Sequence, residues 1–225
     1  MNVGIVITHT KDNMEEKFSQ AAAQGFHHCQ MTSWDPDNWT DEDAEKIRGL
    51  CEKYDMEITA FLCGWAGPRT WNFIDGPETL GIVPLAYRGQ RVQNLIDGAA
   101  YARKLGVTDV VTHMGFIPEN MSDPNYPGVR AAVTEIARVL KSFGQNLLFE
   151  TGQETPVVLL RLFEDVGTGN LYVNLDPANL ILYGKANPVD SLQVFGKYVR
   201  GVHAKDGFYP TNGRELGREV KVGEG

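Results

Sequence analysis

The sequence predicts an α/β protein built as a (β/α)8 TIM barrel, with about seven of its eight βα units present. Short apolar runs rich in β-forming residues alternate with longer segments whose apolar residues recur every three to four positions. Strict alternation of this kind indicates a parallel sheet with right-handed crossovers. The open, doubly wound alternative carries a glycine-rich phosphate loop after its first strand. Here Thr8-His9-Thr10-Lys11 stands at that place and no GxGxxG motif occurs, which favours the barrel.

Seven strands and six helices are expected, all within one domain that covers residues 1–225. The strands are predicted at 3–8, 26–31, 57–62, 109–113, 146–150, 171–175 and 200–203. The helices are predicted at 15–24, 41–54, 89–105, 128–143, 156–166 and 188–198. Thr40 is the expected N-cap of the second helix, and Gly106 is the expected stop of the third.

The loops at the two ends of the predicted barrel differ in length. Helix-to-strand connections are short, whereas those at 63–88, at 114–127 and from 204 onward follow strands and are long. Active sites of this fold are built from the loops that follow the strands. Successive strands start about 33 residues apart, so eight units need roughly 260 residues. We therefore expect the eighth unit to come from a longer natural protein, or its place to be covered by a partner chain.

Composition excludes several classes of function. The 21 Lys and Arg stand against 29 Asp and Glu, and this net charge of −8 argues against a nucleic-acid surface. The chain has no apolar run of about 18 residues and no signal-peptide pattern at its start, so neither a membrane partner nor export is expected. The three cysteines (Cys29, Cys51 and Cys63) form no CxxC pair, which favours a reducing, cytoplasmic location.

Three consecutive predicted strands end in side chains that bind metals. Strand 146–150 ends in Glu150, strand 171–175 is followed by Asp176, and strand 200–203 ends in His203. Each alone has a simpler explanation: a solvated glutamate, an aspartate in a turn before proline, or a core histidine. Together at one rim, two carboxylates and an imidazole indicate a site for one divalent metal ion, Mn, Mg, Co or Zn.

Further candidates lie at the same rim. His9 and His113 end strands one and four, so each either lines the pocket or packs in the core. Trp65 stands in a loop, 64–72, that is rich in glycine and aromatic residues. Aromatic rings suit the apolar C–H faces of sugars, but a long loop also needs apolar anchors to stay packed.

Three motifs resemble the xylose-isomerase-like TIM-barrel family: Phe149-Glu150-Thr151-Gly152-Gln153-Glu154, Asn174-Leu175-Asp176-Pro177-Ala178-Asn179-Leu180 and Val202-His203-Ala204-Lys205-Asp206-Gly207. The family includes sugar-phosphate isomerases and epimerases, ketose 3-epimerases, hydroxypyruvate isomerase and inosose dehydratase. The resemblance covers essentially the whole chain. It implies a small-molecule sugar or sugar-derived substrate and is compatible with a homo-oligomer.

The resemblance also implies roles for single residues. Glu150, Asp176 and His203 match three of the four metal ligands of the family, and Glu150 would also be the catalytic base. The fourth ligand, a glutamate that ends the eighth strand, has no counterpart here, because Glu224 comes too early. Substrate contacts are expected from eight residues: His9, Trp65, His113, Gln153, Glu154, Asn179, Lys205 and Asp206. Asn179 stands where many relatives carry a histidine, and its amide can form hydrogen bonds but cannot take up a proton.

The function expected from these features is that of a metal-dependent sugar isomerase or epimerase. Glu150 would move a proton next to the carbonyl, and the metal would stabilise the resulting enediolate. One alternative is a dehydratase or lyase that acts on a cyclic keto-polyol through the same intermediate. The endonuclease branch of the fold is disfavoured by the acidic charge. A non-catalytic sugar-binding protein is the further alternative, because the second glutamate is absent.

Overall fold

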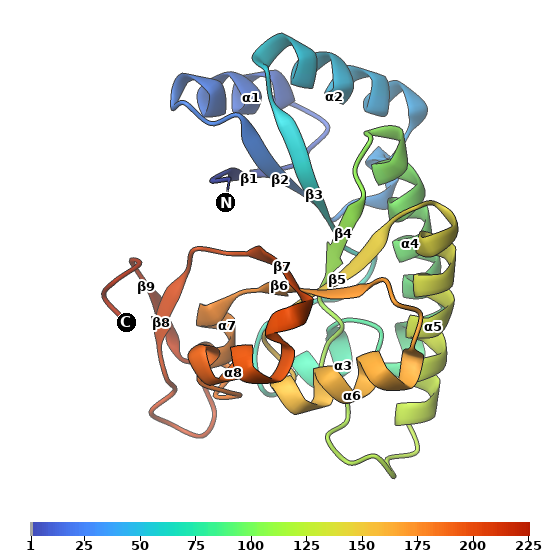
Figure 1. Cartoon of the computed structure of the whole chain (residues 1–225), viewed down its shortest axis with the longest axis vertical. Coiled ribbons are helices and arrows are strands. Elements are labelled where there is room, and N and C mark those ends of the chain that lie inside the picture. The colour runs from blue at the N-terminus through green and yellow to red at the C-terminus, as the bar shows by residue number, and fades with distance from the viewer. Residues whose placement is uncertain (1) are drawn as a thin grey trace.

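The computed structural model describes residues 2–225 and contains seven parallel strands in one curled sheet (Figure 1). The strands pair in chain order: β1 (Ile5–Thr8), β2 (His28–Ser33), β3 (Glu57–Cys63), β4 (Asp109–Thr112), β5 (Asn146–Glu150), β6 (Leu171–Leu175) and β7 (Val199–Val202). Within residues 2–225, no eighth parallel strand joins β7 to β1. The predicted TIM barrel without its eighth unit is therefore confirmed.

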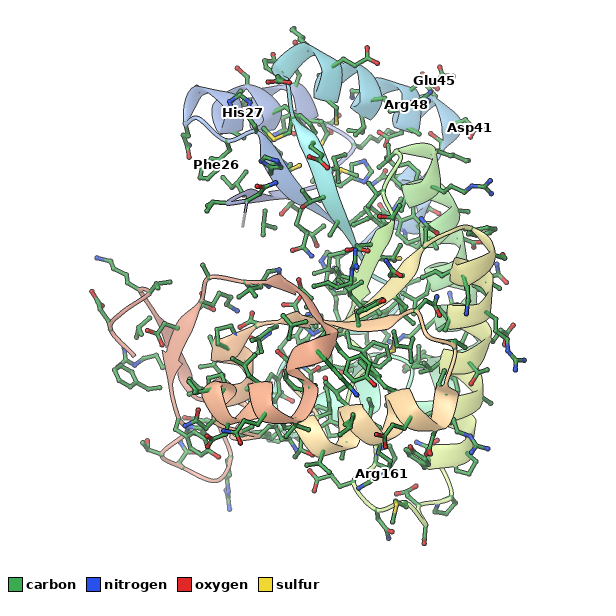
Figure 2. All side chains as sticks on the ribbon, in the orientation of Figure 1. Phe26, His27, Asp41, Glu45, Arg48 and Arg161 are labelled. Atoms are coloured by element: carbon green, nitrogen blue, oxygen red, sulfur yellow. The ribbon has the colours of Figure 1, made fainter. Side chains whose placement is uncertain are left out.

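Helices follow the strands and cover the outer, convex face of the sheet (Figure 1). They are α1 (Met14–Ala23), α2 (Asp41–Tyr54), α3 (Gly76–Thr79), α4 (Leu85–Lys104), α5 (Tyr126–Ser142), α6 (Pro156–Val166), α7 (Pro177–Leu182) and α8 (Pro188–Phe195), with 3₁₀ turns η1 (Pro36–Asn38) and η2 (Gly196–Tyr198). On α2, Asp41, Glu45 and Arg48 are exposed on the outside of this layer (Figure 2). No helix within residues 2–225 is long and apolar enough to cross a bilayer.

The C-terminal part of the described chain folds into a separate antiparallel hairpin of β8 (Asp206–Phe208) and β9 (Arg218–Val220). This hairpin packs against α7, the short helix that follows β6. Neither the hairpin nor α7 was expected from the sequence. Asp176 caps α7, because its Oδ1 accepts the backbone N–H of Asn179 at 2.9 Å, and Pro177 occupies the first helical position.

Several predicted boundaries are wrong by a few residues. Strand two begins and ends two residues later than expected, at His28–Ser33, and α4 begins at Leu85 rather than Gly89. The last helix ends at Phe195 and continues as the 3₁₀ turn η2. The strands that carry the candidate site, β5 and β6, have their predicted bounds.

Side chains alternate between the two faces of the sheet, and this alternation decides which residues reach the barrel interior. On β2, Cys29 and Met31 belong to the large core between sheet and helices. A separate, smaller apolar cluster contains Leu62, Val111 and Leu148, with Ala60 and Tyr172 packed against it. These five residues mark the inner face, so Glu150, two positions after Leu148, also projects inward.

Candidate functional site

Glu150, Asp176 and His203 come together at the carboxyl ends of β5, β6 and β7. One ligand atom from each lies within 4.8 Å of the others. Nδ1 of His203 is 3.0 Å from Oε1 of Glu150 and 3.5 Å from Oδ2 of Asp176. The strand register places the three tips at one level: Glu150 is paired with Asn174, and the backbone N–H of His203 donates to the carbonyl of Leu175.

Positive groups compensate the two buried carboxylates. Burial opposes a charge on His203, but its hydrogen bonds to Asp176 and Glu150 raise its pKa to about 9. Nζ of Lys205 lies 3.2 Å from Oδ2 of Asp176. Burial would raise the pKa of Asp176, yet the contacts with His203 and Lys205 outweigh it and hold this pKa below its ordinary value.

The donor set of this cluster fits a divalent cation. Oε2 of Glu150 is buried and accepts no hydrogen bond from residues 2–225, whereas Oδ2 of Asp176 faces Nζ of Lys205 and Nδ1 of His203. A buried acceptor without a donor is costly unless a cation or water satisfies it. Two carboxylates and one imidazole are a common donor set for Mn, Mg, Co and Zn. The chemistry of the three residues therefore matches the metal site expected from the sequence.

His113 lies beside the cluster, at the tip of β4. Its Nε2 is 3.8 Å from Oε1 of Glu150, and its Nδ1 is buried without a hydrogen-bond partner in the described chain. Burial lowers the pKa of His113, so its ring is neutral near pH 7. The indole of Trp71 meets this ring edge-on, with centroids 4.6 Å apart. A neutral imidazole with an unpartnered nitrogen can donate a hydrogen bond to a hydroxyl group or accept one from it.

The loop after β5 carries two more of the predicted residues. Both polar atoms of the Gln153 amide and both carboxyl oxygens of Glu154 are buried without a hydrogen-bond partner in residues 2–225. Burial raises the pKa of Glu154 to about 8, so this side chain is a neutral acid at pH 7. Substrate contact by these two residues stays a prediction.

Asn179 and Lys205 belong to the edge of the cluster. Lys205 Nζ donates to Oδ1 of Asn179 at 3.2 Å and also lies 3.1 Å from Oε2 of Glu219 on β9. Asp206 has a different role from the predicted one. Its carboxylate accepts the backbone N–H groups of Gly207, Gly223 and Gly225, so it holds the C-terminal loop instead of facing the cluster.

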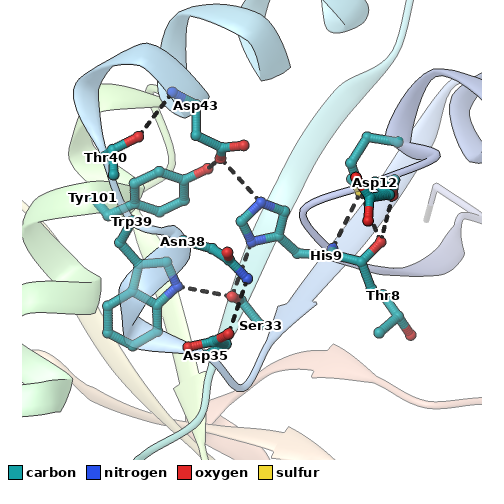
Figure 3. A network of polar contacts seen from close by, with 12 residues as sticks. Thr8, His9, Asp12, Ser33, Asp35, Asn38, Trp39, Thr40, Asp43 and Tyr101 are labelled. Atoms are coloured by element: carbon teal, nitrogen blue, oxygen red, sulfur yellow. Dashed lines mark hydrogen bonds and ion pairs between the residues drawn. The ribbon is translucent and has the colours of Figure 1, made fainter.

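His9 does not join the cluster, and the structure assigns it to a second network in the helix layer (Figure 3). Its Nδ1 lies 2.9 Å from Oγ of Ser33, and its Nε2 lies 2.9 Å from Oδ2 of Asp43. Trp39 Nε1 donates to the same Ser33 hydroxyl at 2.7 Å, and the Tyr101 hydroxyl donates to Asp43. Like Ile7, two positions earlier, His9 projects from the outer face of the sheet and is buried.

The order Ser33, His9, Asp43 is that of a hydrolase triad, but Ser33 cannot act as a nucleophile. Its side chain is completely buried and its oxygen already accepts the Trp39 donor. Burial is the largest influence on His9 and, against the attraction of Asp43, lowers its pKa, so the ring is neutral. The predicted substrate contact of His9 is therefore replaced by a packing role.

Trp65 is also a packing residue, contrary to its predicted role. Its indole is 0% exposed and lies between the Trp34 ring, at 5.2 Å, and the Arg91 guanidinium, at 5.2 Å. Trp71 of the same loop is 39% exposed and contacts His113. Trp65 follows Phe61 and Cys63 on the outer face, and this period-two alternation was the signal that could have excluded it.

Gln30 on β2 was not predicted from the sequence as a residue of this site. Its Oε1 lies 2.5 Å from Nε2 of His203, on the side of the ring opposite the carboxylates. Gln30 lies between Cys29 and Met31, which point into the outer core, so alternation places it on the inner face. A polar residue on the inner face of a barrel strand was the available signal.

Comparisons with known proteins agree with this architecture. The family model described as xylose isomerase-like TIM barrel matches residues 18–225. A xylose isomerase domain protein from Planctomyces limnophilus superimposes with a TM-score of 0.91 and 30% identity, over 99% of this chain and 81% of that one. No curated protein matches the sequence.

Two further structures share the fold at lower identity. A D-tagatose 3-epimerase-like protein has a TM-score of 0.73 and 20% identity, over 99% of this chain and 82% of that one. A D-psicose 3-epimerase, crystallised in the presence of D-fructose, has a TM-score of 0.64 and 15% identity, over 89% and 72%. At these identities the likeness concerns the fold alone.

Proposed function

The chain belongs to the xylose isomerase-like TIM-barrel family, and on this premise we propose that it is a divalent-metal-dependent isomerase or epimerase of sugars or sugar-derived keto compounds. One observation carries the proposal: Glu150, Asp176 and His203 converge within 4.8 Å at the rim where this fold builds its active sites. The fold shared with a D-psicose 3-epimerase is compatible with this substrate class.

Glu150, Asp176 and His203 would hold the metal. When bound, the ion would act as a Lewis acid that stabilises negative charge on a carbonyl oxygen and its neighbouring hydroxyl oxygen. Glu150 supplies the base, because its Oε1 faces His203 while its Oε2 is buried without a donor and is free to accept a proton. The carboxylate takes this proton from the carbon next to the carbonyl. Its return to the former carbonyl carbon, together with transfer of the hydroxyl proton to the former carbonyl oxygen, gives the isomer.

Side chains around this centre would bind and orient the substrate. Trp71 would cover the apolar C–H face of the substrate, because its ring is partly exposed and touches His113. His113, whose ring is neutral, would bind a hydroxyl group. Gln153 and Glu154 have unpartnered polar atoms that would satisfy further hydroxyls, and Glu154 as a neutral acid can donate as well as accept. Lys205 holds Asp176 ionised.

Proton exchange with solvent tests this proposal. The chain is incubated with Mn²⁺ and D-fructose, D-psicose or D-tagatose in D₂O, and deuterium at carbons next to the carbonyl is measured by mass spectrometry and NMR. We expect incorporation together with a product of unchanged formula. Glu150→Gln removes the base and should lower the exchange rate by at least about 10³-fold.

Glu164→Gln is the matched control, because Glu164 is an exposed glutamate on the outer helix α6 and should leave the rate unchanged. A product lighter than the substrate by one water would show that the chain is a dehydratase that uses the same base, and not an isomerase. Full exchange by Glu150→Gln would refute Glu150 as the base. No exchange with a broad set of ketoses and keto acids, despite metal binding, would favour the non-catalytic sugar-binding alternative.

A further inference from the structure

The two ring nitrogens of His203 face different kinds of side chain: carboxylates on one side and amides on the other. Nδ1 faces the carboxylates of Glu150 and Asp176, at 3.0 and 3.5 Å. Nε2 faces two side-chain amides: Oε1 of Gln30 at 2.5 Å and Nδ2 of Asn174 at 3.1 Å. The imidazole therefore presents one nitrogen to the cation site and the other to a polar pair behind it.

Gln30 reaches this position from the far side of the curled sheet. It lies on β2, 173 residues before His203 in the chain, and β2 and β7 are not neighbours in the sheet. Its register partner on β3 is Ala60, which lines the inner apolar cluster, so the Gln30 side chain shares the barrel interior. The contact joins the first half of the barrel to the strand that carries the histidine.

A neutral imidazole can offer a lone pair to a cation at Nδ1 only if its proton sits on Nε2. The carbonyl oxygen of an amide accepts hydrogen bonds and cannot donate them, so Oε1 of Gln30 favours a proton on Nε2. The NH₂ group of Asn174 favours the opposite tautomer, because a donor needs a lone pair on Nε2. The Gln30 contact is the shorter by 0.6 Å, from 3.1 and 2.5 Å, and should prevail.

The carbonyl oxygen of Asn174 points away from the histidine, while its NH₂ group faces the ring. That oxygen lies against Gly201, where an added Cβ would come within 2.3 Å of it, and the glycine leaves the room that the amide occupies. In this arrangement the acceptor for Nε2–H is Oε1 of Gln30. Metal-binding histidines in general donate their second N–H to such a partner, which fixes the ring and its tautomer.

We propose that Gln30 is a positioning residue of the candidate metal centre: its side-chain oxygen keeps the His203 proton on Nε2 and leaves Nδ1 as the metal ligand. This inference rests on the proposed function, because it needs the cation site. Gln30 would touch neither the metal nor the substrate carbon, and it acts only through His203.

Calorimetric titration with Mn²⁺ and NMR of the His203 ring together test this role. Gln30→Met keeps the length of the side chain but removes the acceptor, and we expect a 10- to 100-fold loss of Mn²⁺ affinity, as is typical of such partners. Gln30→Glu restores an acceptor and should recover the affinity to within about threefold. Gln24→Met, at an exposed glutamine after α1, is the matched control.

The NMR readout separates positioning from a loss of stability. In the Zn²⁺-loaded wild type, which is diamagnetic, we expect the His203 proton on Nε2 and the metal on Nδ1, and in Gln30→Met a weakened or mixed pattern. Wild-type affinity in a folded Gln30→Met, or a proton on Nδ1 in the Zn²⁺-loaded wild type, would overturn the proposal. A wild type that binds no Mn²⁺ would instead refute the cation site itself and with it the proposed function.

Discussion

Two histidine–carboxylate clusters of similar composition occupy opposite faces of the same sheet. In the helix layer, the ring of His9 lies between Ser33 and Asp43, and the Trp39 and Tyr101 donors complete the network (Figure 3). On the inner rim, Glu150 keeps a buried oxygen, Oε2, that accepts no hydrogen bond from residues 2–225. In the outer cluster each ring nitrogen of His9 lies 2.9 Å from an oxygen of Ser33 or Asp43, whereas the inner cluster leaves a buried carboxylate oxygen of Glu150 open for a ligand.

The contrast teaches that residue types alone do not identify a site. Histidine and carboxylates serve packing where every donor meets an acceptor, and they serve chemistry where acceptors remain open. Open acceptors cost stability, because burial without a partner is unfavourable. Substitutions in the two clusters should therefore have opposite effects on folding.

The largest effect on stability is expected at Glu154, a buried acid in the loop that follows Glu150 at the end of β5. The folded chain keeps this proton up to about pH 8, whereas the unfolded chain releases it near the ordinary value of 4.5. The unfolded state thus binds fewer protons between these values, and stability falls as the pH rises through this window. Glu154→Gln removes this cost and should stabilise the protein by roughly 2 to 4 kcal/mol at pH 8.

Urea unfolding at pH 8 and pH 4.5 measures this effect, and the low pH is the internal control. At pH 4.5 the glutamine and the protonated acid are close equivalents, so most of the gain should vanish. An equal gain at both values would mean that the carboxyl is ionised in the folded protein or has a partner.

Substitution of Asp43 in the outer cluster is expected to lower the stability of the fold, opposite to the gain expected for Glu154→Gln. Asp43→Ala leaves the Tyr101 hydroxyl and the His9 ring without their acceptor, which should cost about 1 to 3 kcal/mol. Thermal unfolding should show a lower Tm, by about 2 to 4 °C for each kcal/mol in a chain of this size. Glu42→Ala, at the exposed neighbouring position, should be nearly neutral. Unchanged stability in Asp43→Ala would show that the outer network does not stabilise the fold.

The smallest effect concerns Trp71, at the boundary of the inner cluster. Trp71→Ala should raise KM about fivefold with little change in kcat, because a stacking contact of about 1 kcal/mol acts on substrate and transition state alike. Trp71→Phe should recover most of the affinity. Steady-state kinetics compares both with Ile74→Ala, which removes an exposed apolar side chain from the same loop. A normal KM in Trp71→Ala would separate this ring from the substrate.

Much of this architecture was predictable from periodicity. The bounds of β5 and β6 and the convergence of Glu150, Asp176 and His203 follow from apolar runs that end in polar residues at one rim. The same periodicity, applied residue by residue, separates His113 on the inner face from His9 and Trp65 on the outer face. That step needs exact strand ends and side-chain parity, which short strands define poorly.

Other features depend on contacts that no local pattern contains. The helix α7 forms because Asp176 caps it, although Asp176-Pro177 is equally typical of a turn. The strands of the hairpin, β8 and β9, have only three residues each, too few for a clear alternation. The contact between Gln30 and His203 spans 173 residues and exists only once the sheet is curled.

Titration of the intact chain with Mn²⁺ by calorimetry, for the wild type, Asp176→Asn and Asp43→Ala, tests the central claim most directly. The claim is that the inner cluster binds a cation and the outer one does not. We expect one Mn²⁺ per chain in the wild type and in Asp43→Ala. The affinity should be at least about 100-fold weaker in Asp176→Asn, because this variant loses a charged ligand. Absence of binding to the wild type, or equal binding by Asp176→Asn, would contradict it.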